Sequence, residues 1–359
     1  MRRVSAWALA VVVAGFLAAC GDGRGSTSSG PTGSSSPADT ASALSAVVAA
    51  AAREGVFQLY GPSSLDVAGV ERLMTALNQR YGINLEYQFT PSGSMTRDTA
   101  RVITEISAGQ APTWDLMIMT DAHYASLFNN DALERVDWAA LGVTDPRSVT
   151  YDGTTLVIAS SFVAPAYNPN LVRPEDAPKD WPDLLDPKWR GKIAVSTATH
   201  HWGRLAQWWG DEQTTRFMEG LAAQQPMLGR IPELYTRLIL GEVAVYATVT
   251  DSYALEARQT GAPFVFVDTV KPLIATQYNA GLLKGVRHPN QAKLMAVFLL
   301  TPEAQALWEE LQSQSSMFIE GTTAYRYAQG KDVLTLDPKF AAEQLDTLTE
   351  KYGRIVGYR

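Results

Sequence analysis

Residues 178–196 read PKDWPDLLDPKWRGKIAVS, and the organisation of the chain can be worked out from this stretch. Prolines at 178, 182 and 187 disfavour a regular helix here. The last residues of the stretch, 192–196, are predicted as a strand. The stretch is therefore a proline-rich connector that leads into a strand, with further elements on either side of it.

Before the connector, strand, polar loop and helix follow one another in repeated order. Val67, Val70, Leu73 and Leu77 recur at helical spacing, and Gly82 closes that helix. This repetition predicts a parallel sheet covered by helices. The elements predicted in this part are helices over 41–53, 67–77 and around 102–106, and strands over 56–60, 84–89, 115–119, 155–160 and 162–167.

After the connector the pattern turns mainly helical. Thr301-Pro302-Glu303 is a helix start, with threonine as the cap, proline in the first turn and an acid facing the positive end of the helix. The other elements predicted here are helices over 202–209, 214–224 and 231–240, and strands over 243–249 and 264–267.

The N-terminus reads as a secretory leader. Arg2 and Arg3 precede an apolar run over 4–16, which is too short to span a bilayer comfortably. The following Leu-Ala-Ala-Cys resembles a bacterial lipobox, which implies removal of residues 1–19 and a lipid on Cys20. An alternative is a cytoplasmic protein with an apolar helix and a stray cysteine. Cys20 is the sole cysteine, so no disulfide can form within the chain.

Residues 20–40 are predicted as a lipid anchor and a flexible Gly/Ser tether. A flexible chain of this length has a root-mean-square span of about 25 Å. A disordered N-terminus without a role is the alternative.

The 359 residues, 46% of them hydrophobic, suffice for two lobes. The net charge of -7 disfavours nucleic-acid binding.

Three segments carry a resemblance to a known family. The first is 178–193, the second combines Gly285 with 288–294 and 298–305, and the weakest combines 105–106 with 112–116. Together they resemble the group 1 extracellular solute-binding proteins of bacterial ABC importers, in the branch that includes ferric-ion binders.

That resemblance implies an α/β fold of the periplasmic-binding-protein type (type II), with two lobes, each a central β-sheet flanked by helices, and a ligand cleft between them. By analogy lobe one takes 53–152 plus 276–359, and lobe two takes 153–275. The implied protein is an extracytoplasmic, lipid-anchored monomer without a cofactor or enzymatic activity. It would capture a small anionic or polar solute and deliver it to an ABC permease, with no nucleic-acid partner.

Loops at strand ends are the candidate ligand site. In open parallel sheets, ligands bind beyond the carboxyl ends of strands, where helix N-termini present free N–H groups. Each of these hydroxyl-rich loops could instead hold a simple helix cap. The candidates chosen on this basis are Ser63, Ser64, Ser92, Ser94, Thr120, Asp121, Thr197 and Thr199.

Ferric binders of the resembled branch use two adjacent tyrosines late in lobe two. The corresponding stretch is 249–253, where Tyr253 matches one tyrosine and Ser252 replaces the other. The lost phenolate favours an organic or oxyanionic solute, and a ferric ion remains an alternative. Tyr167 and Tyr278, near predicted strand ends, complete the candidate ligand-binding set.

Other aromatic and imidazole residues favour no metal site. Adjacent side chains such as His200 and His201 point in different directions, so one ion rarely binds both. One of these two histidines, with Trp202, is predicted to line the cleft, whereas Trp208 and Trp209 are predicted in the core.

Hydrolase motifs are missing from the sequence, so a secreted hydrolase is a minor alternative. A binding protein coupled to a sensor kinase is another.

Overall fold

The computed structural model describes residues 37–358. The predicted leader, Cys20 and the tether up to residue 36 lie outside the described residues. Helix α1 (Pro37–Ala51) begins inside the predicted tether, so the tether prediction is wrong for residues 37–40. Pro37 and Asp39 suit a first helical turn, and the alanine-rich sequence that follows has high helix propensity.

The first sheet is parallel and has the strand order β2-β1-β3. Its strands are β1 (Phe57–Gly61), β2 (Tyr87–Pro91) and β3 (Leu116–Met117). Helices α2 (Val67–Tyr81), α3 (Met95–Ser107) and α4 (Asp121–Asn129) follow these strands, as the strand–loop–helix pattern predicts. Gly82 ends α2 in the left-handed conformation, with φ of 65°, as predicted for its C-terminus.

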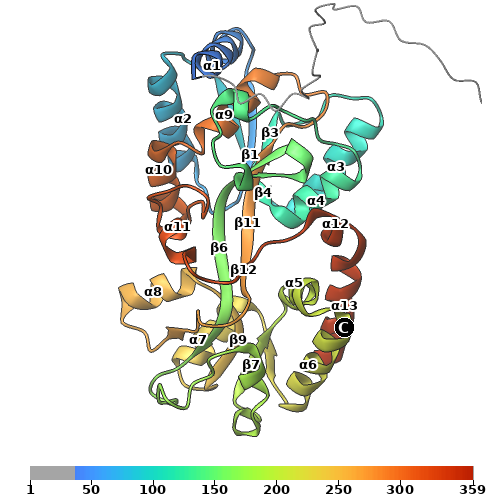
Figure 1. Cartoon of the computed structure of the whole chain (residues 1–359), viewed down its shortest axis with the longest axis vertical. Coiled ribbons are helices and arrows are strands. Elements are labelled where there is room, and N and C mark those ends of the chain that lie inside the picture. Colours follow the sequence, from blue (N-terminus) through green and yellow to red (C-terminus); the bar gives the residue numbers. More distant parts are fainter. Residues whose placement is uncertain (1–36, 359) are drawn as a thin grey trace, which may run out of the picture. The chain divides into compact units, whose positions relative to one another are not determined.

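The second sheet has the order β12-β11-β6-β9-β7-β8, and β4, β5 and β10 pair at its long strands. Figure 1 shows β6 and β11 side by side through the middle of the described part. The strand bounds are β4 (Met119–Thr120), β5 (Val149–Thr150), β6 (Thr155–Tyr167), β7 (Ile193–Ser196), β8 (Met227–Gly229), β9 (Val245–Thr250), β10 (Val265–Phe266), β11 (Leu273–Gly281) and β12 (Val333–Leu334).

The central strand β6 corrects one prediction. The strands predicted over 155–160 and 162–167 form a single strand, because Ser160 and Ser161 continue the ladder to β11. Every residue of β6 is buried. Strand β11 lies next to it and was not predicted at all.

The helices predicted over 202–209, 214–224 and 231–240 and the helix start at Thr301 are confirmed by the helices α5, α6, α7 and α10, whereas the bounds of α8, α9 and α11–α13 were not predicted. The Oγ1 atom of Thr301 accepts a hydrogen bond from the N–H of Ala304, as expected for a cap. The α-helices after the connector are α5 (His200–Trp209), α6 (Asp211–Ala223), α7 (Ile231–Ile239), α8 (Ser252–Thr260), α9 (Pro289–Phe298), α10 (Pro302–Gln312), α11 (Thr323–Ala328), α12 (Pro338–Phe340) and α13 (Asp346–Val356). None of the helices in this described part is long and apolar enough to cross a membrane.

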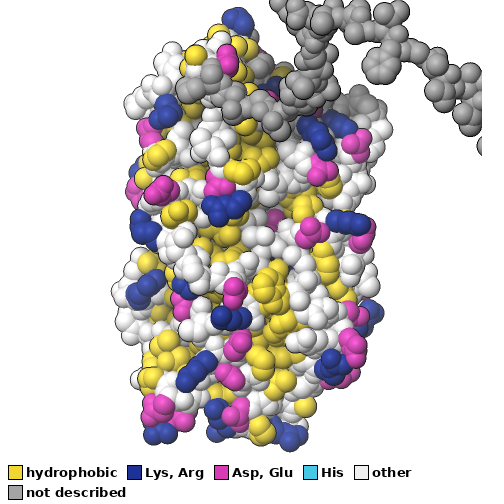
Figure 2. All heavy atoms as spheres, viewed as in Figure 1, with side chains coloured by type: hydrophobic (Ala, Val, Ile, Leu, Met, Phe, Trp, Pro, Cys, Tyr) yellow, Lys and Arg dark blue, Asp and Glu magenta, His cyan; other side chains and the backbone are white. Residues whose placement is uncertain are grey.

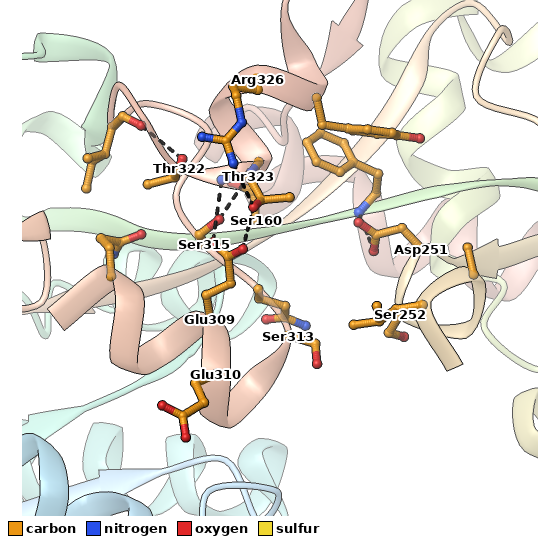
Figure 3. A pocket seen from close by; sticks show the side chains of 18 of the residues that line it. Ser160, Asp251, Ser252, Glu309, Glu310, Ser313, Ser315, Thr322, Thr323 and Arg326 are labelled. Carbon is orange, nitrogen blue, oxygen red and sulfur yellow. Dashed lines mark hydrogen bonds between the residues drawn. The ribbon is translucent and has the colours of Figure 1, made fainter. Parts of the chain in front are cut away.

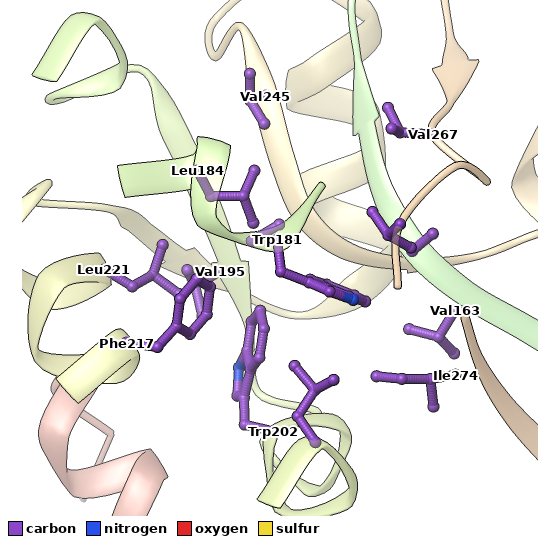
Figure 4. Close-up of a cluster of buried hydrophobic side chains, with 14 of the residues drawn as sticks. Val163, Trp181, Leu184, Val195, Trp202, Phe217, Leu221, Val245, Val267 and Ile274 are labelled. Atoms are coloured by element: carbon purple, nitrogen blue, oxygen red, sulfur yellow. The ribbon is translucent and has the colours of Figure 1, made fainter. Parts of the chain in front are cut away.

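Buried hydrophobic side chains define two lobes. In the first lobe, Phe57, Leu73 and Trp308 pack around the first sheet. In the second lobe, Trp181 and Trp202 pack around β7 and β9, as Figure 4 shows with Phe217 and Leu221. Strands β6 and β11 contribute side chains to both clusters and connect the lobes. The fold class predicted from the resemblance is therefore confirmed.

The exact lobe boundaries remain a prediction. The last helix packs against the second lobe, since Leu348 and Tyr352 of α13 join the cluster of Trp181 and Trp202. This packing favours assigning the C-terminal segment to the second lobe, whereas the analogy assigned it to lobe one.

Charged side chains of both signs are interspersed over the face seen in Figure 2.

Candidate functional site

A cavity of about 950 Å³ lies beside β6, between α8 on one side and α10 and α11 on the other (Figure 3). Helix α10 packs into the first lobe through Ala304 and Trp308. Helix α8 packs on the second lobe through Tyr253. The cavity therefore lies between elements of the two lobes, next to a strand that connects them.

Asp251 forms part of the second-lobe wall of the cavity, between β9 and α8. Its Oδ1 atom accepts hydrogen bonds from Ser161 Oγ at 2.7 Å and from the N–H of Phe162 at 3.1 Å. Burial raises the pKa of this carboxyl group to about 6, despite the hydrogen bonds that favour its ionised form. Among residues 37–358, no lysine, arginine or histidine forms an ion pair with it.

The opposite wall comes from α10 and the start of α11. Glu309 accepts a hydrogen bond from Thr323 Oγ1, and a guanidinium N–H of Arg326 donates to the same Oγ1 at 3.2 Å. Figure 3 shows these three side chains together across the cavity from Asp251. Glu310, one residue further, is paired with Arg72 at 2.7 Å.

Aromatic rings and hydroxyl groups complete the lining. Phe162 of β6 packs against Tyr327 with ring centroids 4.9 Å apart. The N–H of Ser160 donates to the carbonyl oxygen of Ser315 at 2.9 Å, which ties β6 to the segment after α10. Phe264 and further small hydroxyl residues line the remainder. Such a lining combines polar groups that can orient a small molecule with rings that can pack on it.

The predicted serines of the first lobe lie outside this cavity. Ser63 and Ser64 are exposed, and Ser64 Oγ donates to Gln312 Oε1 at 2.6 Å. Ser92 Oγ accepts from the Tyr60 hydroxyl at 2.6 Å, and Ser94 caps α3. The helix-cap alternative thus describes Ser94.

The predicted pair Thr120 and Asp121 is bound within the protein. Thr120 Oγ1 lies 2.7 Å from His123 Nδ1. Both carboxylate oxygens of Asp121 bind the guanidinium of Arg204, at 2.6 and 2.8 Å, and one also accepts from the N–H of Gln277. These groups connect α4, α5 and β11 and do not line the cavity.

The remaining predicted site residues are also dispersed. Thr197 is exposed, and Thr199 is buried at the start of α5. Tyr167 belongs to the second-lobe core, and Tyr278 lies in β11 opposite Thr120 of β4. Tyr253 packs on Tyr235, with ring centroids 4.5 Å apart.

Only the neighbourhood of Tyr253 leads to the cavity. Asp251 and Ser252, from the same predicted stretch, line it, whereas Tyr253 does not. Asp251 directly follows β9, so the rule that ligands bind at strand ends could have identified it. Glu309 and Arg326 carry no such local signal, because tertiary packing brings them to the cavity.

The aromatic and histidine predictions have mixed outcomes. Trp202 is fully buried against Trp181, so the prediction that it lines the cleft is wrong (Figure 4). Trp209 is partly buried and packs against the second-lobe core, in line with the prediction, whereas Trp208 is 52% exposed, contrary to prediction. Burial lowers the pKa of His200 to about 4. In the described residues, no three His, Cys, Asp or Glu side chains cluster as a metal site.

Two lobes joined by paired strands, with a cavity between elements of each, define the architecture of a solute-binding protein. A model of the family described as bacterial extracellular solute-binding protein matches residues 58–310. The chain belongs to this family, which confirms the resemblance seen in its sequence.

Solved structures share the fold. Iron-bound HitA from Pseudomonas aeruginosa is 18% identical, with a TM-score of 0.67, over 83% of this chain and 99% of that one. The Trichodesmium protein IdiA (FutA), solved with iron and citrate, is 16% identical, with a TM-score of 0.69, over 85% and 100%. At this level of identity the likeness shows the fold alone.

A curated relative matches in sequence. An uncharacterized protein of Haemophilus influenzae is 31% identical over 163 residues, which make up 42% of this chain and 45% of that protein. The match thus spans less than half the length of that relative.

Proposed function

We propose that this protein captures a small polar solute in the cavity between α8 and α10–α11 and delivers it to an ABC import permease. The observation that carries the proposal is the cavity itself, about 950 Å³, lined by elements of both lobes. A solute that contacts both walls binds most tightly when the lobes are closed, so it selects the closed population. A permease could recognise that closed form.

We place the protein outside the cytoplasmic membrane, held by a lipid on Cys20. The support for this part is the sequence alone: a basic and apolar leader followed by Leu-Ala-Ala-Cys. Membership of the extracellular solute-binding family agrees with export. We propose that the protein acts as a monomer.

An organic solute fits the cavity better than a ferric ion. The neighbouring structures of HitA and FutA contain iron, but in this chain Tyr253 packs on Tyr235 and lies outside the cavity lining. A hard cation needs several oxygen ligands at short range. The cavity instead offers separated acids, two arginines, hydroxyls and aromatic rings.

A thermal-shift screen of the purified protein tests the proposal. The panel contains ferric ion with citrate, phosphonates, sugars, carboxylates, amino acids and polyamines. A solute at a hundred times its dissociation constant adds about 2.7 kcal/mol to the free energy of unfolding, which shifts the midpoint by several degrees. We expect one class to shift the midpoint and to be recovered chemically unchanged.

Matched variants tie that shift to the cavity. Ala306 is exposed on α10 and lines the cavity, so Ala306→Trp should place a bulky indole in it and abolish the shift. Ala68→Trp, at an exposed position on α2 outside the cavity, is the control and should retain the shift. A shift that survives Ala306→Trp, or consumption of the solute, would count against the proposal.

A further inference from the structure

We infer that the solute carries a cationic nitrogen, which binds beside the carboxylate of Asp251 in the aromatic-lined part of the cavity. This inference rests on the proposed function and names the class of its solute. It keeps the polar solute expected from the sequence and replaces the anionic group expected there with a cationic nitrogen.

The charges that line the cavity are mainly negative. Two of the acids are already compensated, since Glu310 pairs with Arg72 at 2.7 Å and Asp268 lies 3.5 Å from Lys331. Asp251 and Glu309 form no ion pair with any residue that the structure describes. The lining acids are Asp251, Asp268, Glu309, Glu310 and Glu320, against the two bases Arg258 and Arg326.

Asp251 is the carboxylate that gains most from a cation. It is partly buried and receives hydrogen bonds from Ser161 and Phe162, but these are neutral donors. A shielded carboxylate without an opposite charge is unfavourable, and a bound ammonium or guanidinium group supplies that charge together with new hydrogen bonds. An anionic group at the same place would be repelled.

Aromatic rings next to this carboxylate favour the same class. Phe162, Tyr327, Phe264 and Phe266 line the cavity together with Asp251. A cation near such rings gains about 0.5–2 kcal/mol, more than a neutral group of the same size. A carboxylate flanked by rings therefore selects an organic cation, including one whose nitrogen carries methyl groups.

The two arginines can bind a second group of the solute. Arg326 donates to Thr323 and to the backbone oxygen of Gly321, and Arg258 on α8 forms no ion pair among the described residues. They can donate to a hydroxyl or a carboxylate of the same molecule. The inference is thus compatible with simple amines and with zwitterions, which share the cationic nitrogen.

Binding assays with defined probes test the inference. The probes are choline, spermidine and arginine as cations, glucose as a neutral solute, and citrate and phosphate as anions. We expect at least one cation to bind to the wild-type protein. Asp251→Asn should lower the affinity for that cation about 10-fold or more, because a charged hydrogen bond is lost. Asn can keep the acceptor for Ser161 and Phe162. Asp131→Asn, at an exposed acid remote from the cavity, should bind as wild type.

A second variant guards against a folding defect in the first. Glu309→Gln keeps an acceptor for Thr323 and should also lower the affinity for the cation. Glucose, citrate and phosphate should remain unbound in every variant. Binding of only neutral, anionic or ferric solutes, blocked by Ala306→Trp, would overturn the inference and leave the proposed function standing. Cation binding that is unchanged in both variants would overturn the inference too. No binding by any probe or by the wider screen would overturn both.

Discussion

The carboxylate of Asp121 and the guanidinium of Arg204 form a two-point ion pair, at 2.6 and 2.8 Å, with both side chains only 2% exposed. Asp121 begins α4, which packs near the first sheet, and Arg204 lies on α5 in the second lobe. Both also bind backbone groups of β11. The pair therefore connects the lobes at a strand that runs between them.

Removing one partner should destabilise the protein strongly. We expect Asp121→Asn to lower the free energy of unfolding by about 3–5 kcal/mol, because Arg204 then lacks a buried counter-ion. Adding Arg204→Met should recover part of the loss. Glu212→Gln, which disrupts an exposed pair with Arg216, should change stability by less than about 1 kcal/mol. Urea unfolding measures all three, and equal stability of wild type and Asp121→Asn would refute the expected role of the pair.

The Asp251 carboxyl group predicts a pH effect on the solute-free protein. Its pKa is raised by burial to about 6, so the folded state holds this proton more tightly than the unfolded state. The stability that the group contributes is therefore complete below about pH 4 and is lost as pH rises through 6. Tyr327, Asp268 and Arg258 are the other titratable or charged groups near it on the cavity wall.

Asp251→Asn should remove the loss of folding stability that wild type shows as pH rises through 6. We expect the variant to gain stability relative to wild type, on the order of 1–2 kcal/mol, between pH 5 and pH 7.5. Thermal midpoints at both pH values measure the difference, with Asp131→Asn as the control. A constant difference in stability between variant and wild type across this range would show that the carboxyl group does not titrate there.

The affinity of the wild-type protein for choline, whose charge is permanent, should rise as pH increases through 6, because the Asp251 carboxyl group becomes ionised.

Two tryptophans on α5 provide a matched pair for the core. Trp202 is fully buried against Trp181, whereas Trp208 is 52% exposed. We expect Trp202→Ala to cost about 3–5 kcal/mol and Trp208→Ala about 0.5 kcal/mol or less. Comparable losses for the two variants, measured by urea unfolding, would contradict the assignment of Trp202 to the second-lobe core.

Lipid attachment at Cys20 is testable in cells. Radiolabelled palmitate should be incorporated into the wild-type protein and not into Cys20→Ser, because the chain has no other thiol. The serine variant should also leave the membrane fraction. Labelling of both proteins to the same extent would exclude Cys20 as the attachment point.

Local sequence pattern was sufficient for most of the fold but not for the two strands that connect the lobes. Strand β6 is buried along its whole length, so it lacks the alternation that marks a half-exposed strand, and its two serines resemble a break. Strand β11 contains Gln277 and Asn279, whose polarity hides the strand. Tertiary partners accommodate Asn279, since Thr150 and Thr155 hydroxyl oxygens accept hydrogen bonds from its side-chain amide.

The candidate site shows the same limit. The resemblance to ferric binders led to residue 253, and Asp251 of the same stretch directly follows β9. The strand-end rule led instead to Asp121, whose oxygens are bound by Arg204 from a distant part of the chain. The opposite wall, with Glu309 and Arg326, comes from helices whose sequence shows only ordinary amphipathic pattern. Their place beside α8 depends on long-range packing.

Isothermal titration of the best-binding cation into the purified protein tests the central claim most directly. We predict one solute per chain for wild type and for Ala68→Trp, with no detectable heat of binding for Ala306→Trp. Binding by Ala306→Trp with unchanged affinity and stoichiometry would place the solute outside the cavity between α8 and α10–α11 and contradict the account.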